Sequence, residues 1–222
     1  MTAAQLIFDD RADAGRRLDA ALPPLDQAET VVIALPRGGV PVAAEICSAR
    51  ELPLELVLVR KIGAPGRREL AVGAVTDGPD PHVTVNRRTA RHFGLSPADF
   101  ESMGRDLLPE IERRRATYLG KREPAALAGK TLVVVDDGVA TGATLKASLT
   151  ALKERQPHSI IVAMPVGPDD LASALSGLAD TVICLRDLGP IGAVGGAYRR
   201  FTQVDDATVR TIVDRFAPEA PG

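Results

Sequence analysis

Short, uninterrupted apolar runs alternate along the chain with longer segments whose apolar residues recur at helical spacing. Strands that are apolar throughout are typical of a parallel sheet that helices cover on both sides. The alternation of strands with helices favours βαβ units. The pattern therefore predicts an α/β fold with a mainly parallel central sheet and helices on both faces. The apolar runs occupy residues 31–35, 54–59, 131–135, 159–165 and 181–185.

The helical segments have recognisable ends. Ser96 precedes Pro97, and Asp99 follows three residues after the serine, which is the pattern of a capped helix start with proline in the first turn. Two further strands, at residues 71–75 and 82–85, are expected on either side of a loop. Residues 60–68 carry Gly and Pro turn signals and are expected to form a loop. The expected helices cover residues 10–22, 40–49, 97–119, 144–155, 169–178 and 206–216.

Length and composition narrow the class of protein. A chain of 222 residues with 45% hydrophobic residues predicts a single domain that spans residues 1–222. A net charge of −2 and only 3% aromatic residues argue against a nucleic-acid partner, which needs a basic surface and stacking side chains. The sequence shows acidic residues near its start and no apolar run of about 18 residues, so we expect a cytoplasmic protein without membrane contact.

The segment VVVDDGVATGAT, at residues 133–144, has the features of a phosphate and ribose site. Its three valines end a strand, and in open parallel sheets ligands bind at the carboxyl ends of strands. The adjacent carboxylates of Asp136 and Asp137 can accept hydrogen bonds from a diol and can hold Mg²⁺ directly or through water. Small residues and hydroxyls follow at the start of a helix, where backbone amides bind anions. These loop residues are Gly138, Ala140, Thr141, Gly142, Ala143 and Thr144.

This segment closely resembles the 5-phosphoribosyl-1-pyrophosphate (PRPP) signature of the type I phosphoribosyltransferases. The resemblance implies that Asp136 and Asp137 hold the ribose hydroxyls, with Mg²⁺ as cofactor, and that residues 140–144 hold the 5′-phosphate. A plain strand, turn and helix whose acids only cap the helix is the alternative. The Asp pair together with a Gly/Thr loop favours the ligand site.

Two basic segments fit the pyrophosphate that the reaction would release. Arg37, Gly38 and Gly39 follow the first strand and resemble the pyrophosphate loop of the same family. Arg60 and Lys61 resemble the basic lead-in to the flexible loop of adenine phosphoribosyltransferases, which closes over the site. The resemblance implies PRPP contacts from all these residues, with Arg37, Lys61 and the Asp pair as the catalytic set.

The acceptor is expected to bind beneath a small hood. We expect a core of about residues 28–186 and a hood built from about residues 1–27 and 187–222. Tyr198 and Phe201 can stack on a planar acceptor, although packing is the alternative role for both. Glu69 is a candidate acid or base, or an ion-pair partner of the neighbouring arginines. Phe8, Asp9 and Arg11 are further hood candidates.

The order of motifs over nearly the whole chain resembles a bacterial group of predicted phosphoribosyltransferases. That resemblance implies transfer of a phosphoribosyl group from Mg–PRPP to a nitrogen acceptor such as a nucleobase. Ala140 stands where hypoxanthine-guanine enzymes, which resemble this loop, place the acceptor's base, so this route to 6-oxopurine salvage is not expected.

Two other functions remain open at this point. The same anion loops would serve hydrolysis or phosphorolysis of a nucleotide. A regulator that senses PRPP without turnover is the second, and a basic stripe between residues 105 and 122 would be its partner surface; a solvated helix face is the other explanation of that stripe. The acceptor cannot be identified from the sequence, and a homo-oligomer is compatible with it.

Overall fold

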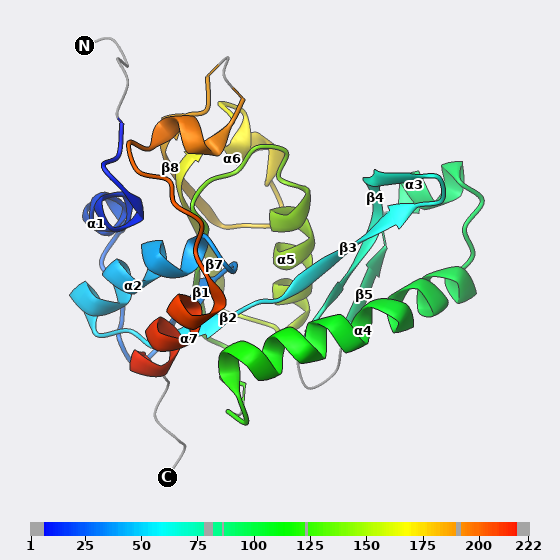
Figure 1. The fold of residues 1–222 in the computed structure, drawn as a ribbon, viewed down its shortest axis with the longest axis horizontal. Helices are drawn as coiled ribbons and strands as arrows, with labels where there is room; N and C mark the ends of the chain where they lie inside the picture. Colours follow the sequence, from blue (N-terminus) through cyan, green and yellow to red (C-terminus); the bar gives the residue numbers. More distant parts are fainter. Residues whose placement is uncertain (1–6, 78–81, 86, 123, 190–191, 217–222) are drawn as a thin grey trace.

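The computed structural model describes residues 7–77, 82–85, 87–122, 124–189 and 192–216. Its centre is a five-stranded sheet with the strand order β2-β1-β6-β7-β8, and every neighbouring pair is parallel (Figure 1). These strands are β1 (Thr30–Ala34), β2 (Leu54–Leu56), β6 (Thr131–Val135), β7 (Ser159–Gly167) and β8 (Thr181–Asp187).

Helices cover both faces of this sheet. Alternate strand positions, such as Val32 and Val133, are buried in a core with α1, α2 and α7, while the intervening positions, such as Ile33 and Val134, are buried with α5 and α6. Each strand therefore buries both of its faces, which explains why the strands are continuous apolar runs. The predicted α/β fold is confirmed. The helices are α1 (Arg11–Ala21), α2 (Gly39–Arg50), α5 (Ala143–Glu154), α6 (Leu171–Ala174) and α7 (Asp206–Arg215).

The register of β1 and β6 aligns the ends of these two strands. Ala34 pairs with Val135, and the amide of Leu35 donates to the carbonyl of Val135 at 3.0 Å. The chain therefore leaves both strands at the same edge of the sheet. Residues 36–39 and residues 136–144 therefore begin side by side, as a site shared by the two segments requires.

A three-stranded antiparallel sheet extends from the central sheet as a separate arm (Figure 1). It consists of β3 (Val59–Ala64), β4 (Arg67–Thr76) and β5 (His82–Val85), with α3 (Arg87–His92) and the long α4 (Pro97–Leu119) beside it. The expectation of a loop at residues 60–68 is therefore wrong. Ile62 and Ala64 are buried while Lys61 is exposed, so the strand alternates with period two against the core. The turn signals mark only the tip, where Gly66 has φ +71°.

Two other local differences separate prediction from structure. The helix expected at residues 169–178 is only one turn, α6, because the chain turns at Gly177 with φ +78° before β8. The short α3 was not predicted. By contrast, α4 begins where expected, since the Ser96 side chain accepts from the Asp99 amide and the Asp99 side chain from the Ser96 amide.

The N- and C-terminal segments lie together against the same edge of the sheet. Phe8 forms a parallel bridge with Tyr198, and its backbone hydrogen bonds with Ala197 and Arg199 are 2.9 Å and 2.8 Å long. The division into a core and a hood stays a prediction, and residues 1–6, 190–191 and 217–222 of that hood lie outside the described part of the chain. No helix in the described ranges combines the length and the apolarity needed to cross a membrane.

Candidate functional site

The Asp pair lies at the end of β6, where the sequence placed it. The amide of Asp137 donates to Oδ1 of Asp136 at 2.8 Å, so the two carboxylates are held in a fixed relation. Burial, reinforced by the adjacent negative charge of Asp137, raises the pKa of Asp136 well above the usual range of a carboxyl group. The two carboxylates therefore lie in a fixed geometry at the strand end, where their oxygens can accept hydrogen bonds from a diol.

Arg11, the first residue of α1, binds Asp137 directly. Its Nε and Nη2 donate to Oδ2 of Asp137 at 2.9 Å and 2.7 Å, and its Nη1 donates to the carbonyl of Thr202 at 2.7 Å. Both partners are largely buried, with side-chain exposures of 11% for Arg11 and 15% for Asp137. Burial raises the pKa of Asp137, and the hydrogen bonds from Arg11 oppose that rise. Arg11 binds only Oδ2 of Asp137, so Oδ1 lies outside this ion pair.

Three aromatic rings support this ion pair from the terminal segments. The hydroxyl of Tyr198 donates to the carbonyl of Asp137 at 2.5 Å. Its ring lies between Phe8 and Phe201, with ring centroids 5.4 Å and 5.0 Å away. The guanidinium of Arg11 stacks 4.0 Å from the centre of the Phe201 ring, a favourable cation–π geometry. Tyr198 is 7% exposed, so it acts here through packing and through its hydroxyl.

The loop at residues 36–39 approaches the Asp pair more closely than any side chain would permit. A Cβ at Gly38 would lie 1.9 Å from Oδ2 of Asp137. A Cβ at Gly39 would lie 2.6 Å from the carbonyl of Val135. Glycine is therefore required at both positions, and the loop backbone forms one wall of the site. The structure brings this predicted loop and the Asp pair together.

The loop after the Asp pair leads into α5 as predicted. Gly138 has φ +153° and no space for a Cβ, which would lie 2.5 Å from Val166 and 2.6 Å from Val194. Gly142 takes the left-handed conformation with φ +70° immediately before the helix. The first intrahelical bond joins the amide of Lys146 to the carbonyl of Gly142, so the amides of residues 143–145 precede it. Ala140, Thr141 and Thr144 are exposed there.

A cavity of about 370 Å³ opens beside Asp137. Arg37 and Phe201 both line it, and Phe201 is 40% exposed. Arg37 also lies 3.5 Å from Asp206 at the start of α7, whose carboxylate accepts from Tyr118 at 2.8 Å. The Arg37 cation, the Asp137 carboxylate and the exposed ring of Phe201 therefore face one cavity. Its lining residues are Arg11, Arg37, Gly38, Asp137, Phe201, Thr202, Gln203 and Val204.

Other predicted residues do not line this cavity. Arg60 and Lys61 lie on β3 of the arm, where Nη2 of Arg60 donates to Oε1 of Glu110 on α4 at 2.7 Å. Nε of Arg60 is buried and has no hydrogen-bond partner in the described part of the chain. Glu69 lies on β4, and its side chain is outside what the structure describes.

Comparison with known proteins agrees with this geometry. The profile of the family described as phosphoribosyl transferase domain matches residues 21–192. The chain belongs to this family. Two Mycobacterium tuberculosis proteins, Rv0571c and MT0597, which carry provisional phosphoribosyl transferase names, are each 41% identical to it over 209 residues. The alignment covers 94% of this chain and 47% of each relative, so the chain spans about half the length of the curated relatives it matches.

A solved structure resembles the whole phosphoribosyl transferase domain. The protein TT1426 from Thermus thermophilus superposes with a TM-score of 0.84 and is 36% identical in sequence. The match covers 96% of this chain and 100% of that one. The arm and the terminal segments therefore belong to a shared architecture rather than to this sequence alone.

The donor set of this phosphoribosyl transferase domain suits a sparsely held metal ion. Among the described residues, no group of three His, Cys, Asp or Glu side chains could form a metal cluster. Asp136 and Asp137 provide carboxylate oxygens, and one oxygen of Asp137 is already bound to Arg11. Mg²⁺ is commonly held by one or two carboxylates plus substrate phosphates and water. The residues present therefore fit Mg²⁺ that is carried mainly by a phosphorylated substrate.

Sequence reasoning listed Arg11 only as a hood candidate and missed its contact with Asp137. The two residues are 126 positions apart, so no local pattern joins them. The role of Tyr198 in holding the Asp137 carbonyl was also missed. A signal was present in both cases, because both residues were already candidates for the hood. Their positions in the sequence do not say which side chains meet.

Proposed function

We propose that the protein binds Mg–PRPP and transfers its 5-phosphoribosyl group to a nitrogen acceptor, such as a nucleobase, with release of pyrophosphate. One observation carries the proposal. The Asp pair, the Arg37–Gly38–Gly39 loop and the amide-rich start of α5 converge at the ends of two paired strands. A diol site beside two anion sites is what PRPP requires.

Each part of PRPP has a candidate partner. Asp136 and the Oδ1 oxygen of Asp137 would accept hydrogen bonds from the ribose hydroxyls. The loop at residues 138–144, with Gly138, Ala140, Thr141, Gly142, Ala143 and Thr144, would bind the 5′-phosphate through backbone amides and hydroxyls. Arg37 and the amides of Gly38 and Gly39 would bind the pyrophosphate.

The arm would complete the pyrophosphate site. Arg60 and Lys61 lie on β3, which leaves the edge strand β2 after two residues. Closure of the arm would bring these cations over the leaving group, where exclusion of water strengthens charge stabilisation. Lys61 and Arg37 are therefore the proposed cationic members of the catalytic set.

The reaction itself needs no enzyme nucleophile. The acceptor nitrogen would form a bond to C1 of the ribose while the bond from C1 to the pyrophosphate oxygen breaks, and the acceptor proton would pass to solvent or to a protein base. The chain would contribute positioning of the two reactants and stabilisation of the negative charge that develops on the leaving group. Bound Mg²⁺ would supply further neutralisation of the phosphate oxygens.

Phe201 is the candidate acceptor platform. Its ring lines the same cavity as Asp137 and is 40% exposed. Because Arg11 and Tyr198 already pack against this ring, a planar acceptor would contact its remaining exposed part. Tyr198, an equal candidate in the sequence, is buried beneath it and would hold the Asp137 backbone. Glu69 stays a candidate acid or base.

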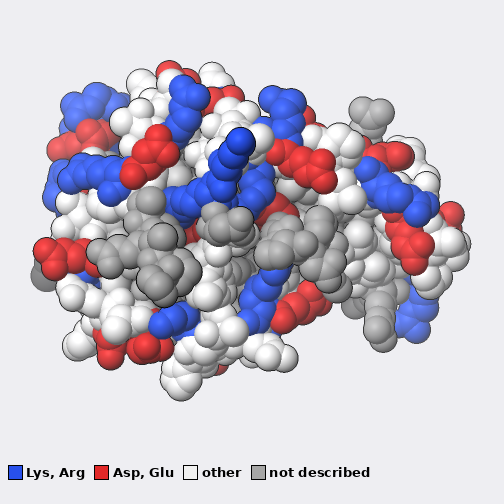
Figure 2. Space-filling view, turned by 90° about the horizontal axis from the view of Figure 1, so that it is seen from below, with Lys and Arg blue, Asp and Glu red and all other residues white. Residues whose placement is uncertain are grey.

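The surface gives the regulator hypothesis little support. Within the basic stripe at residues 105–122, Arg115 pairs with Asp77, and Arg122 lies 3.6 Å from Glu55, so both turn inward. In the face shown in Figure 2, basic and acidic side chains are interspersed among uncharged ones instead of forming one basic surface. A small-molecule partner therefore fits better than a nucleic acid.

The deciding test is release of pyrophosphate from Mg–PRPP in the presence of a panel of nucleobases. We expect acceptor-dependent release, and the double variant Asp136→Asn/Asp137→Asn should lose PRPP binding in calorimetry. Asp214→Asn, an exposed change on α7, is the matched control and should bind normally. Unchanged PRPP affinity in the double variant would refute the site, and tight binding without turnover would favour a sensor.

A further inference from the structure

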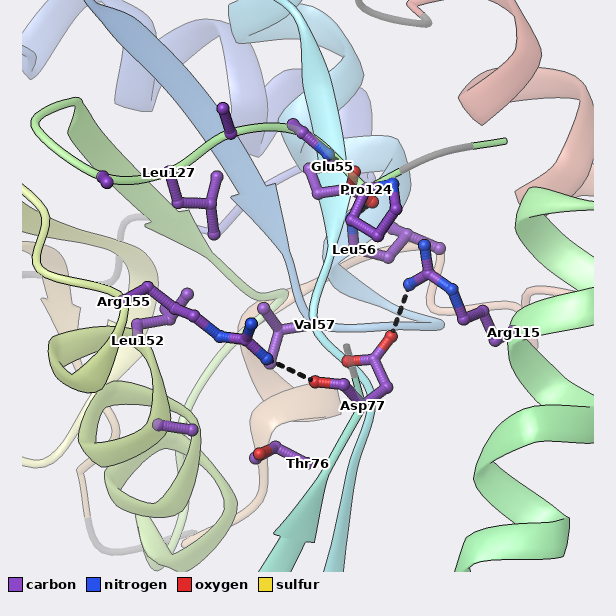
Figure 3. A pocket seen from close by; sticks show the side chains of 14 residues that line it. Glu55, Leu56, Val57, Thr76, Asp77, Arg115, Pro124, Leu127, Leu152 and Arg155 are labelled. Carbon is purple, nitrogen blue, oxygen red and sulfur yellow. Dashed lines mark hydrogen bonds and ion pairs between the residues drawn. The ribbon is translucent and has the colours of Figure 1, made fainter. Parts of the chain in front are cut away.

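A second cavity, of about 310 Å³, lies at the base of the arm (Figure 3), and neither Asp136 nor Asp137 lines it. It is bordered by the edge strand β2, the end of β4, α4, the last turn of α5 and residues 124–128. This volume is within the range of small-molecule sites. Its lining residues are Glu55, Leu56, Val57, Thr76, Asp77, Arg115, Pro124, Ala125, Ala126, Leu127, Ala128, Ala151, Leu152 and Arg155.

The two acids in this cavity already accept hydrogen bonds. Asp77 accepts from the amide of Leu58 at 2.9 Å and from Nη1 of Arg115 at 2.9 Å. Glu55 accepts from the amides of Leu56 and Ala125 at 2.9 Å and 2.8 Å. Both oxygens of each carboxylate therefore have a donor, and neither acid needs a ligand.

The two arginines are different, because they retain donors. Nη2 of Arg115 is buried and has no hydrogen-bond partner among the described residues. Arg155 donates Nη2 to the backbone carbonyl of Asp77 at 3.2 Å, and no carboxylate in the described part of the chain pairs with it. Figure 3 shows the two guanidinium groups approaching Asp77 from opposite sides of the cavity. Because Nη2 of Arg115 is closed off from solvent, an anion in the cavity would meet Arg115 through its positive charge and would accept hydrogen bonds from Arg155.

The remaining wall is apolar. Leu56 and Val57, Leu127 of the alanine-rich segment at residues 124–128, and Leu152 of α5 line the cavity with aliphatic groups (Figure 3). We propose that this cavity binds a small amphipathic anion, whose carboxylate or phosphate accepts from Arg155 beside the positive charge of Arg115 and whose aliphatic body packs on the apolar wall. Charge-assisted hydrogen bonds at one end and area burial at the other would fix its orientation.

The position of the cavity couples it to the arm. Asp77, directly after β4, is bound to Leu58, directly before β3. Its side chain accepts from the amide of Leu58, and its own amide donates to the Leu58 carbonyl at 3.0 Å. Leu58 is two residues before Arg60. An anion that holds Arg115 and Arg155 in place would restrain Asp77 and hence the start of β3. Binding here does not depend on phosphoribosyl transfer, so it can be measured without turnover.

The test is a calorimetric titration of the purified protein with butanoate, hexanoate and octanoate, and with inorganic phosphate as a head group alone. We expect saturable binding that strengthens with chain length and is weakest for phosphate. Arg155→Gln should weaken hexanoate binding about tenfold, as expected for one lost charge-assisted hydrogen bond. Arg105→Gln removes the same charge from an exposed α4 position that does not line the cavity, and it should bind like the wild type.

Two further measurements guard against an indirect effect. Ala151→Leu adds bulk to the cavity wall without a change in charge and should abolish binding. In the wild type, hexanoate should slow amide hydrogen exchange at residues 58–64. Absence of saturable binding for every probe, or equal affinity in Arg155→Gln and wild type, would overturn the proposal. So would an affinity that falls as protein concentration rises, because a second copy of the chain would then cover the cavity.

Discussion

Two Arg–Asp pairs of the described residues lie at strand ends, and they leave opposite hydrogen-bonding groups outside the pair. At the end of β6, all three nitrogens of the Arg11 guanidinium bind Asp137 or Thr202, while Oδ1 of Asp137 lies outside the ion pair. At the end of β4, Asp77 has donors on both oxygens, while Nη2 of Arg115 is unpartnered. The first pair therefore has a spare acceptor, and the second has a spare donor that is closed off from solvent.

The two pairs therefore suit different classes of ligand. Spare carboxylate oxygens fit hydroxyl donors such as a ribose diol, whereas a spare guanidinium nitrogen fits an anion. The difference has a backbone origin, because a main-chain amide binds Asp77, whereas Arg11 alone among the described residues binds Oδ2 of Asp137. An ion pair alone therefore says little about function until the remaining donors and acceptors around it are counted.

Loss of Arg11 should have the largest effect. Arg11→Met leaves a largely buried carboxylate without its cation, and we expect the free energy of unfolding at pH 7 to fall by about 3–5 kcal/mol. Arg16→Met is the control, because Arg16 is 60% exposed and its bridge to Glu45 is worth no more than about 1 kcal/mol. Urea unfolding measures both. Similar losses in the two variants would contradict a special role for the pair.

The same variant has a pH dependence of defined sign. Burial already raises the pKa of Asp137, and without Arg11 that pKa should rise further. A folded-state pKa above the unfolded value costs stability when the carboxyl is ionised, and protonation removes that cost. The stability gap between wild type and Arg11→Met should therefore narrow as pH falls from 7 through the raised pKa. A gap that widens in acid would be the opposite result.

Gly38→Ala tests the closeness of the loop to the acceptor pair. The new Cβ would lie 1.9 Å from Oδ2 of Asp137, so either the loop or the Arg11 contact must shift. We expect a loss of about 1–3 kcal/mol in stability and a fall in PRPP affinity of at least about tenfold. Gly177→Ala meets open space at φ +78° and should show backbone strain alone, with PRPP affinity unchanged. Calorimetric titration with Mg–PRPP distinguishes the two variants.

Arg115→Met should cost less than Arg11→Met. The Leu58 amide still donates to Asp77 after the change, and the unpartnered Nη2 is removed together with the lost ion pair. We expect a loss of about 2 kcal/mol, measured by urea unfolding. Arg105→Met, at an exposed position of the same helix, is the control and should be near neutral. If Arg115→Met proved as damaging as Arg11→Met, the contrast between the two pairs would fail.

Local patterns explain why the strand-end loops could be predicted and the arm could not. The segment at residues 133–144 contains its own strand, acids, glycines and helix start, so its geometry follows from adjacent residues. At residues 60–66, the cations and the Gly and Pro residues masked the alternation of buried and accessible side chains in β3. The buried members of that strand are Ile62 and Ala64. Pairing with β4 and packing against α4 decide that strand, and both are interactions that a local reading does not include.

Long-range contacts account for the remaining difference. Asp137 was assigned from its neighbours, but its partners Arg11 and Tyr198 come from the two ends of the chain. Likewise Asp77 meets Arg115 and Arg155 from separate helices. Sequence spacing contains no distance for such pairs, so the cavity at the arm base had no sequence signal at all.

Tyr198→Phe should have the smallest effect and tests the backbone side of the first pair. The ring would keep its packing between Phe8 and Phe201, while the Asp137 carbonyl would lose a 2.5 Å hydrogen bond. We expect a loss of about 1 kcal/mol in unfolding free energy, the typical value of one such bond. PRPP affinity should fall modestly if the hydroxyl orients Asp137, whereas Thr117→Ala, which removes a hydroxyl from the Arg113 carbonyl on α4, should leave it nearly unchanged. Identical PRPP affinities in wild type and Tyr198→Phe would mean that Arg11 alone orients the carboxylate.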